Sequence, residues 1–179
     1  MNAFYAKLKE TLEQGNEVVL ATAVDQLVEF SDSYDVLISQ KAFLCQDELT
    51  AETPSMRPFW EPLFTAVPDQ LPDVFFQDTW WAFFDALETP FPAGVLDKLA
   101  AGETLVLATA ITKAGSNADF AAAKMAVDKS GAVYGSFGNP EMDAKILETA
   151  KSVLDEYVPR LLEYPVEGST LRILLDPIN

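Results

Sequence analysis

The chain contains the same apolar, strand-like stretch twice, as Glu17-Val-Val-Leu-Ala-Thr-Ala-Val24 and as Glu103-Thr-Leu-Val-Leu-Ala-Thr-Ala-Ile111. Both stretches are apolar at successive positions, which favours a strand that is covered on both of its faces. A helix-like segment that closes on a glycine, Gly15 or Gly102, precedes each stretch. Glycine commonly ends helices because it adopts the left-handed conformation without strain. The sequence therefore predicts two helix–glycine–strand units.

The two units repeat at a constant offset. Gly15 and Gly102 lie 87 positions apart, and at this offset Leu20-Ala-Thr-Ala23 meets Leu107-Ala-Thr-Ala110. A four-residue identity alone could be coincidence, but the shared context favours duplication. We predict that residues 1–89 are a degenerate N-terminal copy, that residues 90–179 are the second copy, and that residues 1–179 form one compact unit.

The remaining pattern mixes strands with helices. Apolar runs of strand length and apolar stripes of helical period alternate along the chain. We expect further strands at 34–39, 41–45, 124–128, 132–135 and 170–175, and helices at 79–88 and 140–157. The predicted fold class is α/β, or α+β, with a mixed sheet flanked by helices.

Composition excludes several functions. The chain has no histidine, one cysteine and a formal net charge of −16. Histidine-dependent nucleophile systems and histidine metal sites are therefore excluded, and we predict neither a catalytic site nor a metal site. Nucleic acids and anionic membranes would be repelled. We predict a cytoplasmic protein, because no apolar run approaches membrane length and no signal peptide is evident. Cys45 ends an apolar run and is predicted to be a buried small hydrophobe.

Half of the aromatic residues, ten of 20, fall between Phe59 and Phe91, in a segment interrupted by prolines. One interpretation is a seam that packs the two copies together. The other is a partner or homodimer surface around Trp80, Trp81 and Phe84, because aromatic residues dominate interface hot spots.

The stretch from Gly115 to Asp143 is the candidate functional segment. Gly115-Ser116-Asn117 directly follows a strand, where small residues allow a sharp turn that exposes backbone N–H groups to a ligand. A second turn runs from Gly135 and Ser136 through Gly138 into a helix that Asn139 caps. The alternative interpretation of this second turn is a well-made helix start without a ligand.

Residues 103–178 resemble the first domain of the XdhC/CoxI family, the xanthine dehydrogenase accessory proteins. The resemblance rests on Leu107-Ala-Thr-Ala-Ile111, Gly115-Ser116, Lys124-Met125, Val133-Tyr-Gly-Ser136, Gly138-Asn139, Asp143 and Leu171-Arg-Ile-Leu-Leu-Asp-Pro177. It implies a role in maturing a molybdenum enzyme, with that enzyme as client, and in handling molybdenum cofactor. We expect no C-terminal Rossmann domain of the kind that family members usually carry.

The resemblance implies a cofactor-binding set formed by both turns and the lysine between them: Gly115, Ser116, Asn117, Lys124, Gly135, Ser136, Gly138, Asn139 and Asp143. The chain departs from the family pattern where Asn117-Ala118-Asp119 replaces Ser-Pro-Arg and Ala122 replaces a glycine. An aspartate in place of an arginine opposes an anionic ligand, so these changes predict weakened cofactor binding.

Three functions remain open on the sequence. The leading hypothesis is a non-enzymatic accessory protein of the XdhC/CoxI type that handles molybdenum cofactor. The alternative is a scaffold of the same fold that has lost cofactor binding and works through its aromatic surface. A third is an enzyme that uses Asp119 and Asp143 as an acid–base pair.

Overall fold

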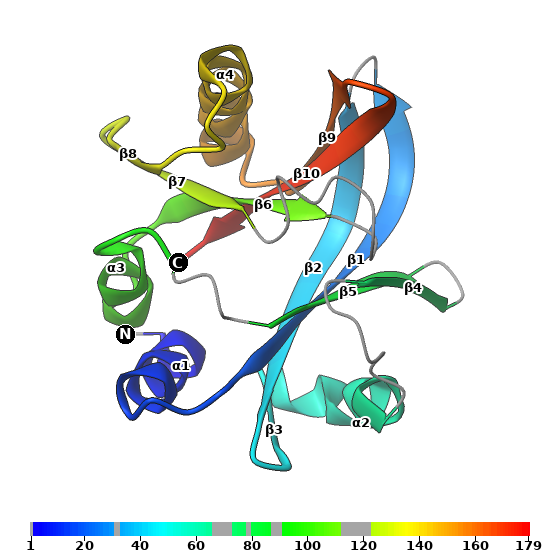
Figure 1. Cartoon of the computed structure of the whole chain (residues 1–179), viewed down its shortest axis with the longest axis vertical. Coiled ribbons are helices and arrows are strands. Elements are labelled where there is room, and N and C mark those ends of the chain that lie inside the picture. The colour runs from blue at the N-terminus through cyan, green and yellow to red at the C-terminus, as the bar shows by residue number, and fades with distance from the viewer. Residues whose placement is uncertain (1, 31–32, 66–72, 78–79, 87–90, 112–122) are drawn as a thin grey trace.

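The computed structural model describes residues 2–30, 33–65, 73–77, 80–86, 91–111 and 123–179 (Figure 1). For residues 24–38 and 73–86, only the backbone within this range is described. The predicted binding turn Gly115–Asn117 and the predicted acid Asp119 lie outside the described residues.

The first half contains one helix, three strands, a 3₁₀ turn with a second helix, and two further strands. These elements are α1 (Ala3–Glu13), β1 (Val19–Phe30), β2 (Ser33–Cys45), β3 (Glu48–Ala51), η1 (Pro54–Met56), α2 (Arg57–Thr65), β4 (Asp73–Gln77) and β5 (Trp80–Ala86). Apart from η1, the second half repeats this order. Its elements are α3 (Val95–Ala101), β6 (Leu105–Ile111), β7 (Lys124–Asp128), β8 (Val133–Gly135), α4 (Pro140–Glu156), β9 (Arg160–Val166) and β10 (Ser169–Ile178).

The strands form one sheet of two matching halves. The order is β4-β5-β1-β2-β9-β10-β6-β7-β8, with β3 paired to β2, and every described pair is antiparallel. The halves join where β2 and β9 pair, from Ser33↔Leu162 to Asp35↔Arg160. A sheet with flanking helices is therefore confirmed, and its antiparallel pairing makes α+β the fitting alternative.

Strand register agrees with the sequence repeat. Leu20 of β1 lies opposite Asp85 of β5, and Leu107 of β6 lies opposite Asp176 of β10. In the same way Thr22↔Lys41 in the first half corresponds to Thr109↔Lys124 in the second. Shared topology and register support the predicted duplication of residues 1–89 and 90–179, which stays a prediction.

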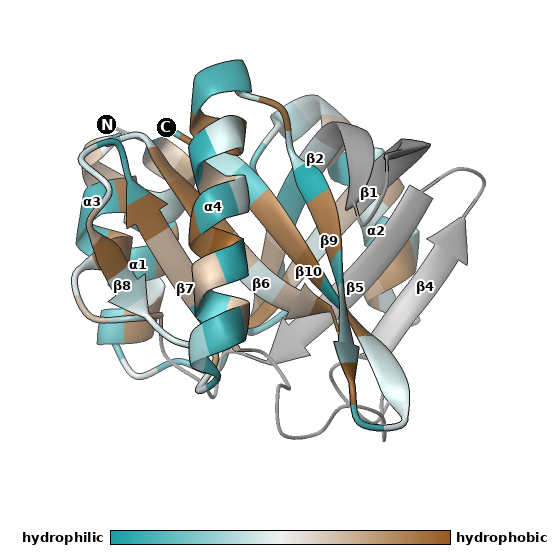
Figure 2. Ribbon diagram, turned by 90° about the horizontal axis from the view of Figure 1, so that it is seen from above, coloured by the Kyte–Doolittle hydropathy of each residue, from teal (hydrophilic) through white to brown (hydrophobic). Residues whose placement is uncertain are grey.

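Three hydrophobic clusters hold the helices on the sheet. α4 covers the second half through Met142, Ile146, Ala150 and Val153, and its polar side faces outward in Figure 2. α2 covers the first half through Trp60, Leu63 and Phe64. Burying one stripe of each helix in this way provides most of its stability.

The third cluster is shared between the halves. α1 and α3 lie side by side (Figure 1), and Phe4, Tyr5 and Leu8 pack with Val95 and Leu99. Strand residues from both halves complete the cluster: Leu20, Phe43, Leu105, Leu107, Ala126 and Ile178. This cluster, rather than α2, joins the two halves through side chains.

The prediction of a helix over residues 79–88 is wrong. Residues Trp80–Ala86 form β5, which pairs with β1 on one side and β4 on the other. Aromatic residues favour strands, and pairing on both sides outweighs the helical spacing of Trp80, Phe83 and Phe84.

Three other boundaries differ from prediction. The two strands expected at 34–39 and 41–45 are one strand, β2, and β1 continues beyond Val24 because it pairs with β2 along its length. β9 was not among the predicted strands, and it contains Pro165, a residue that is rare in central strands. Pro165 is accommodated because it lies beyond the three residues of β9 that pair with β2.

The interpretation of the aromatic segment as a seam between the copies is corrected for α2. Phe59, Trp60 and Phe64 pack on the sheet of their own half. Phe91 alone among the described aromatic side chains of this segment joins the shared cluster. The side chains of Trp80, Trp81 and Phe84 lie outside the described part, so the predicted dimer surface stays a prediction.

Candidate functional site

Lys124 opens β7, seven positions after Asn117 of the predicted binding turn. Its side chain is buried, and its ammonium lies 5.8 Å from the centre of the Phe91 ring. Thr109, opposite it on β6, is buried too. A desolvated cation over an aromatic face gains about 2 kcal/mol. This contact holds Lys124 against the segment that leads into α3.

Gly135 is required by close packing. Its φ is +78°, and a Cβ there would lie 2.6 Å from Cγ of Pro92 and 2.8 Å from the carbonyl oxygen of Lys124. Only glycine combines this backbone conformation with this approach. Gly135 therefore has a structural reason that involves no ligand. Gly138 also has a positive φ, +79°, but a Cβ there would meet nothing within 4 Å.

The turn before α4 is closed by Asp143. Its carboxylate accepts hydrogen bonds from the backbone N–H of Phe137 at 2.9 Å and from the Ser136 hydroxyl. The Ser136 oxygen in turn accepts from the Gly138 N–H at 2.8 Å. The donors of this turn thus point at a carboxylate that belongs to the chain itself.

Asn139 caps the start of α4 and accepts hydrogen bonds from its first backbone N–H groups. Its Oδ1 accepts hydrogen bonds from the N–H groups of Glu141, at 3.0 Å, and Met142, at 3.1 Å. Pro140 has no N–H to satisfy, and Asp143 N–H donates to the Asn139 carbonyl. This is a capped helix start, as the ligand-free interpretation of the sequence predicts.

These bonds bear on whether the turn fits molybdenum cofactor. The cofactor carries a phosphate and a dithiolene, and an anion of this kind needs free N–H or hydroxyl donors and cationic side chains. The Ser136 hydroxyl and the N–H groups of Phe137, Glu141 and Met142 already donate to Asp143 or Asn139, and Asp143 and Glu141 add negative charge. The Ser136–Asp143 part of the predicted set therefore does not fit an anionic cofactor, because its bonded donors and its negative charge both oppose one.

Two buried charges that sequence reasoning missed lie between the halves. Lys41 of β2 forms an ion pair with Asp176 of β10, and both side chains are almost fully buried. Ser39 donates to the same carboxylate at 2.9 Å. Burial lowers the pKa of Lys41, and the charge of Glu52 opposes that shift. The sequence signal for this pair was a lysine and an aspartate inside apolar strands, because a buried charge needs a partner of opposite charge.

A second missed network surrounds Asp128 at the end of β7. Its carboxylate accepts hydrogen bonds from the Ser130 hydroxyl and N–H, the Ala132 N–H and the Tyr134 hydroxyl. These bonds, that from the Ser130 hydroxyl foremost, lower the pKa of Asp128 to about 2. The network ties the β7–β8 turn together.

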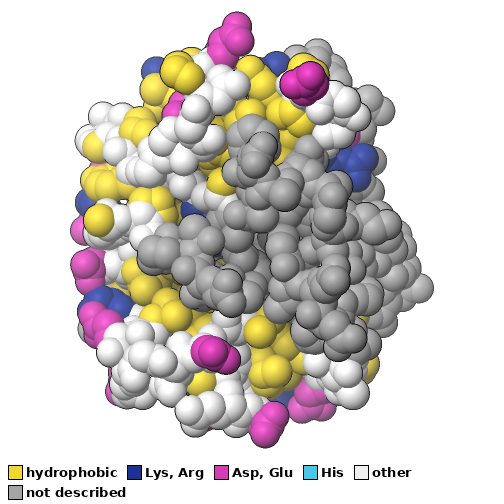
Figure 3. Space-filling model, viewed as in Figure 1, with side chains coloured by type: hydrophobic (Ala, Val, Ile, Leu, Met, Phe, Trp, Pro, Cys, Tyr) yellow, Lys and Arg dark blue, Asp and Glu magenta, His cyan; other side chains and the backbone are white. Residues whose placement is uncertain are grey.

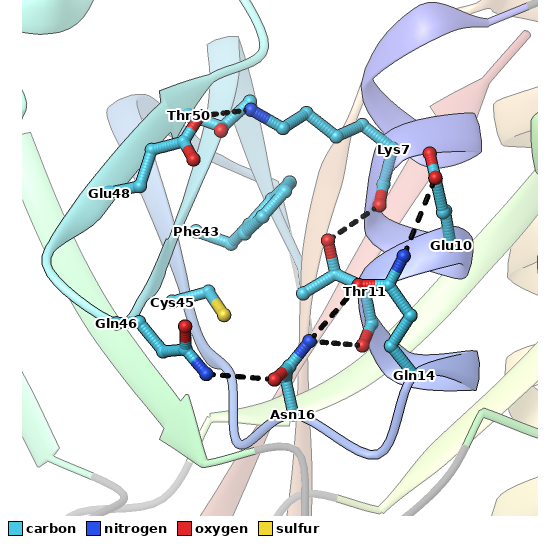
Figure 4. Close-up of a pocket in the computed structure, with 10 residues that line it drawn as sticks. All are labelled: Lys7, Glu10, Thr11, Gln14, Asn16, Phe43, Cys45, Gln46, Glu48 and Thr50. Atoms are coloured by element: carbon cyan, nitrogen blue, oxygen red, sulfur yellow. Dashed lines mark hydrogen bonds and ion pairs between the residues drawn. The ribbon is translucent and has the colours of Figure 1, made fainter.

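Cys45 is partly exposed rather than buried, which corrects the prediction. It lies in a pocket of about 280 Å³ between α1 and the β2–β3 hairpin (Figure 4). Lys7 and Glu48 form an ion pair across this pocket, and Gln46 donates to Asn16 at 2.9 Å. The polar side chains around the thiol bind one another, and this arrangement indicates no particular ligand.

Other candidate chemistry can be located only in part. No group of three metal-ligating side chains and no helix long and apolar enough to cross a membrane occurs among the described residues. Acidic side chains lie scattered around the face seen in Figure 3. The predicted acid pair cannot be measured, because Asp119 lies outside the described residues.

Comparison with protein-family models gives one match. Residues 98–165 match the model of the XdhC and CoxI family, a range that includes β6, β7, β8 and α4. No curated protein matches the chain significantly. Over residues 98–165 the chain is thus similar to the XdhC and CoxI family.

Proposed function

We propose that the chain is a non-enzymatic accessory protein that binds a xanthine dehydrogenase-type or CO dehydrogenase-type enzyme as its client. The family match suggests an accessory role in the maturation of such enzymes. The absence of histidine from the sequence removes the commonest acid–base catalyst and supports a non-enzymatic role.

The observation that carries the proposal is the Asp143 carboxylate. It occupies the donors of the turn that the family resemblance assigns to cofactor binding. A ligand anion would have to displace a covalently tethered carboxylate, whose effective concentration at these donors is far higher than that of a free ligand. The chain then acts on its client through protein contacts rather than by carrying cofactor at this turn.

The second candidate function is molybdenum cofactor handling through Gly115, Ser116, Asn117 and Lys124. Lys124 favours it, because this buried cation follows Asn117 by only seven positions in the sequence. Cofactor binding in this form would leave the Gly135–Asp143 turn as structural support.

The two functions are separated by measuring client and cofactor binding on the same proteins. The full chain, Asp143→Ala and Asp155→Ala are each mixed with molybdenum cofactor released from a molybdoenzyme, and bound molybdenum is counted after gel filtration. The same three proteins are then used to capture the client enzyme. Asp155 is the matched control, since it is an exposed acid elsewhere on α4.

We expect all three proteins to capture the client, and neither the wild type nor Asp155→Ala to retain molybdenum. Retention by Asp143→Ala alone would show that the carboxylate blocks an ancestral site. If the wild type retains stoichiometric molybdenum, the second candidate replaces the first. Failure to capture any molybdoenzyme would overturn the accessory role.

A further inference from the structure

A groove of about 540 Å³ runs between α1 and the segment that enters α3. Its floor is apolar and is made by Leu12 of α1, Leu96 of α3, and Phe91 and Pro92 just before α3. Leu12 and Leu96 are only partly buried, so they present apolar surface to the groove. Ligand sites typically have volumes of about 300–1,000 Å³, so the groove has room for several side chains.

The rim of the groove is acidic. Among the described residues that line it, Lys9 is the only basic one, and its ammonium is shared between Glu13 at 2.6 Å and Asp97 at 3.4 Å. Both carboxylates are more than 60% exposed. These carboxylates, Glu13 first, raise the pKa of Lys9. A basic side chain of a ligand could therefore bind the exposed carboxylates of Glu13 and Asp97, which already pair with the Lys9 ammonium.

The groove is open rather than enclosed. Gly15 and Gly94 line it, and a Cβ added at either glycine would meet nothing within 4 Å. Small molecules are usually held in concave sites that bury most of their surface. An open trough with an apolar floor instead fits a segment of polypeptide that runs through it.

The floor also contacts the family-matched domain. The Phe91 ring lies below the Lys124 ammonium, and Pro92 fits against Gly135 so closely that no Cβ could be added there. A segment bound in the groove would therefore contact the residues that support Lys124. The groove lies on the seam between the two halves, where α1 and α3 meet.

We propose that this groove docks an exposed segment of a partner protein that carries apolar side chains beside a lysine or arginine. The apolar side chains cover Leu12, Phe91 and Leu96, and the basic side chain joins Glu13 and Asp97. The net charge of −16 favours a basic partner and repels an acidic one. The inference does not depend on whether the partner is a molybdoenzyme.

The test uses a fluorescein-labelled short peptide of alternating leucine and lysine, with leucine–glutamate and serine–lysine peptides as controls. Fluorescence anisotropy is measured with the full chain, Leu96→Glu, Asp97→Lys and Ala144→Glu. Ala144 is exposed on α4, so its variant adds a carboxylate away from the groove. Asp97→Lys changes the rim and leaves the apolar floor in place. It therefore tests the groove even if Leu96→Glu fails to fold.

We expect saturable binding of the leucine–lysine peptide to the wild type and to Ala144→Glu. Leu96→Glu and Asp97→Lys should each weaken it about tenfold or more, equivalent to about 1.4 kcal/mol. The serine–lysine peptide should bind weakly and without sensitivity to Leu96→Glu. Equal binding by all four proteins would place the peptide elsewhere and overturn the proposal. Absence of saturable binding to the wild type would overturn it as well.

Discussion

Asp128 is the residue whose environment most clearly departs from that of a solvated acid. Its side chain is 13% exposed and accepts four hydrogen bonds within the β7–β8 turn. Hydrogen bonds to the ionised form stabilise it over the neutral acid. The low pKa of Asp128 therefore reflects local bonds rather than its ion pair with Lys98, whose closest atoms are 3.7 Å apart.

This pKa predicts how Asp128 contributes to acid stability. The ordinary pKa of 3.8 falls to about 2 on folding, so the stabilisation is complete above about pH 4 and is lost between pH 4 and pH 2. It amounts to at most about 2.4 kcal/mol. We expect Asp128→Asn to flatten the pH dependence of the free energy of unfolding in this window, measured by urea denaturation. Asp155→Asn, an exposed control on α4, should keep the wild-type slope, and equal slopes for both variants would contradict the prediction.

Single residues show what sequence reasoning could and could not reach. The cap Asn139 was predictable, because capping depends on neighbours within one helical turn. The Asp143 carboxylate was expected near the helix start, but its bonds to Phe137 and Ser136 depend on the fold of the turn. Gly135 looked like a ligand-binding glycine, whereas the residue that requires it, Pro92, lies far away in sequence.

At the scale of elements, β8 leads into α4 through two glycines with different requirements. Gly135 and Gly138 share a positive φ, but only Gly135 is in close contact with other atoms. The left-handed conformation costs an L-residue about 1–2 kcal/mol, and overpacking adds about 1–3 kcal/mol.

We therefore expect Gly138→Ala to lower the free energy of unfolding by about 1 kcal/mol, and Gly135→Ala by about 3 kcal/mol. Thermal and urea unfolding of both variants measure the difference. Gly138→Ala is the control for Gly135→Ala, because both glycines have a positive φ and only Gly135 is closely packed. If the two costs are equal, packing against Pro92 is not what keeps Gly135 in this chain.

Elements with one-sided amphipathic patterns were predictable, and those that depend on neighbouring strands were not. α1 and α4 follow their apolar stripes closely. β5 instead carries a helical spacing of aromatics but pairs with β1 and β4. The lengths of β1 and β2 also follow from their pairing with each other. The polar residues between 25 and 35 interrupt the apolar pattern, so the sequence does not show that both strands continue.

At the scale of the whole molecule, the Lys41–Asp176 pair connects β2 of the first half to β10 of the second. Removing one partner of a buried pair leaves an uncompensated charge and costs about 3–5 kcal/mol, whereas replacing both by apolar residues is often neutral. We expect Asp176→Asn to destabilise the chain by about this amount. Lys41→Met/Asp176→Leu should be within about 1 kcal/mol of the wild type. Urea denaturation of Lys41→Met, Asp176→Leu and the double variant closes the cycle, and additive costs would mean that the two charges do not interact.

The sequence by itself determined the two helix–glycine–strand units, the similarity of residues 98–165 to the XdhC and CoxI family and the exclusion of histidine chemistry. Each of these depends on residue identity or on short-range periodicity. Only the tertiary structure decided that the ten strands form one antiparallel sheet, that Lys41 meets Asp176 and that Gly135 meets Pro92. These contacts join residues distant in sequence, and their energies depend on burial and packing, which no local pattern records.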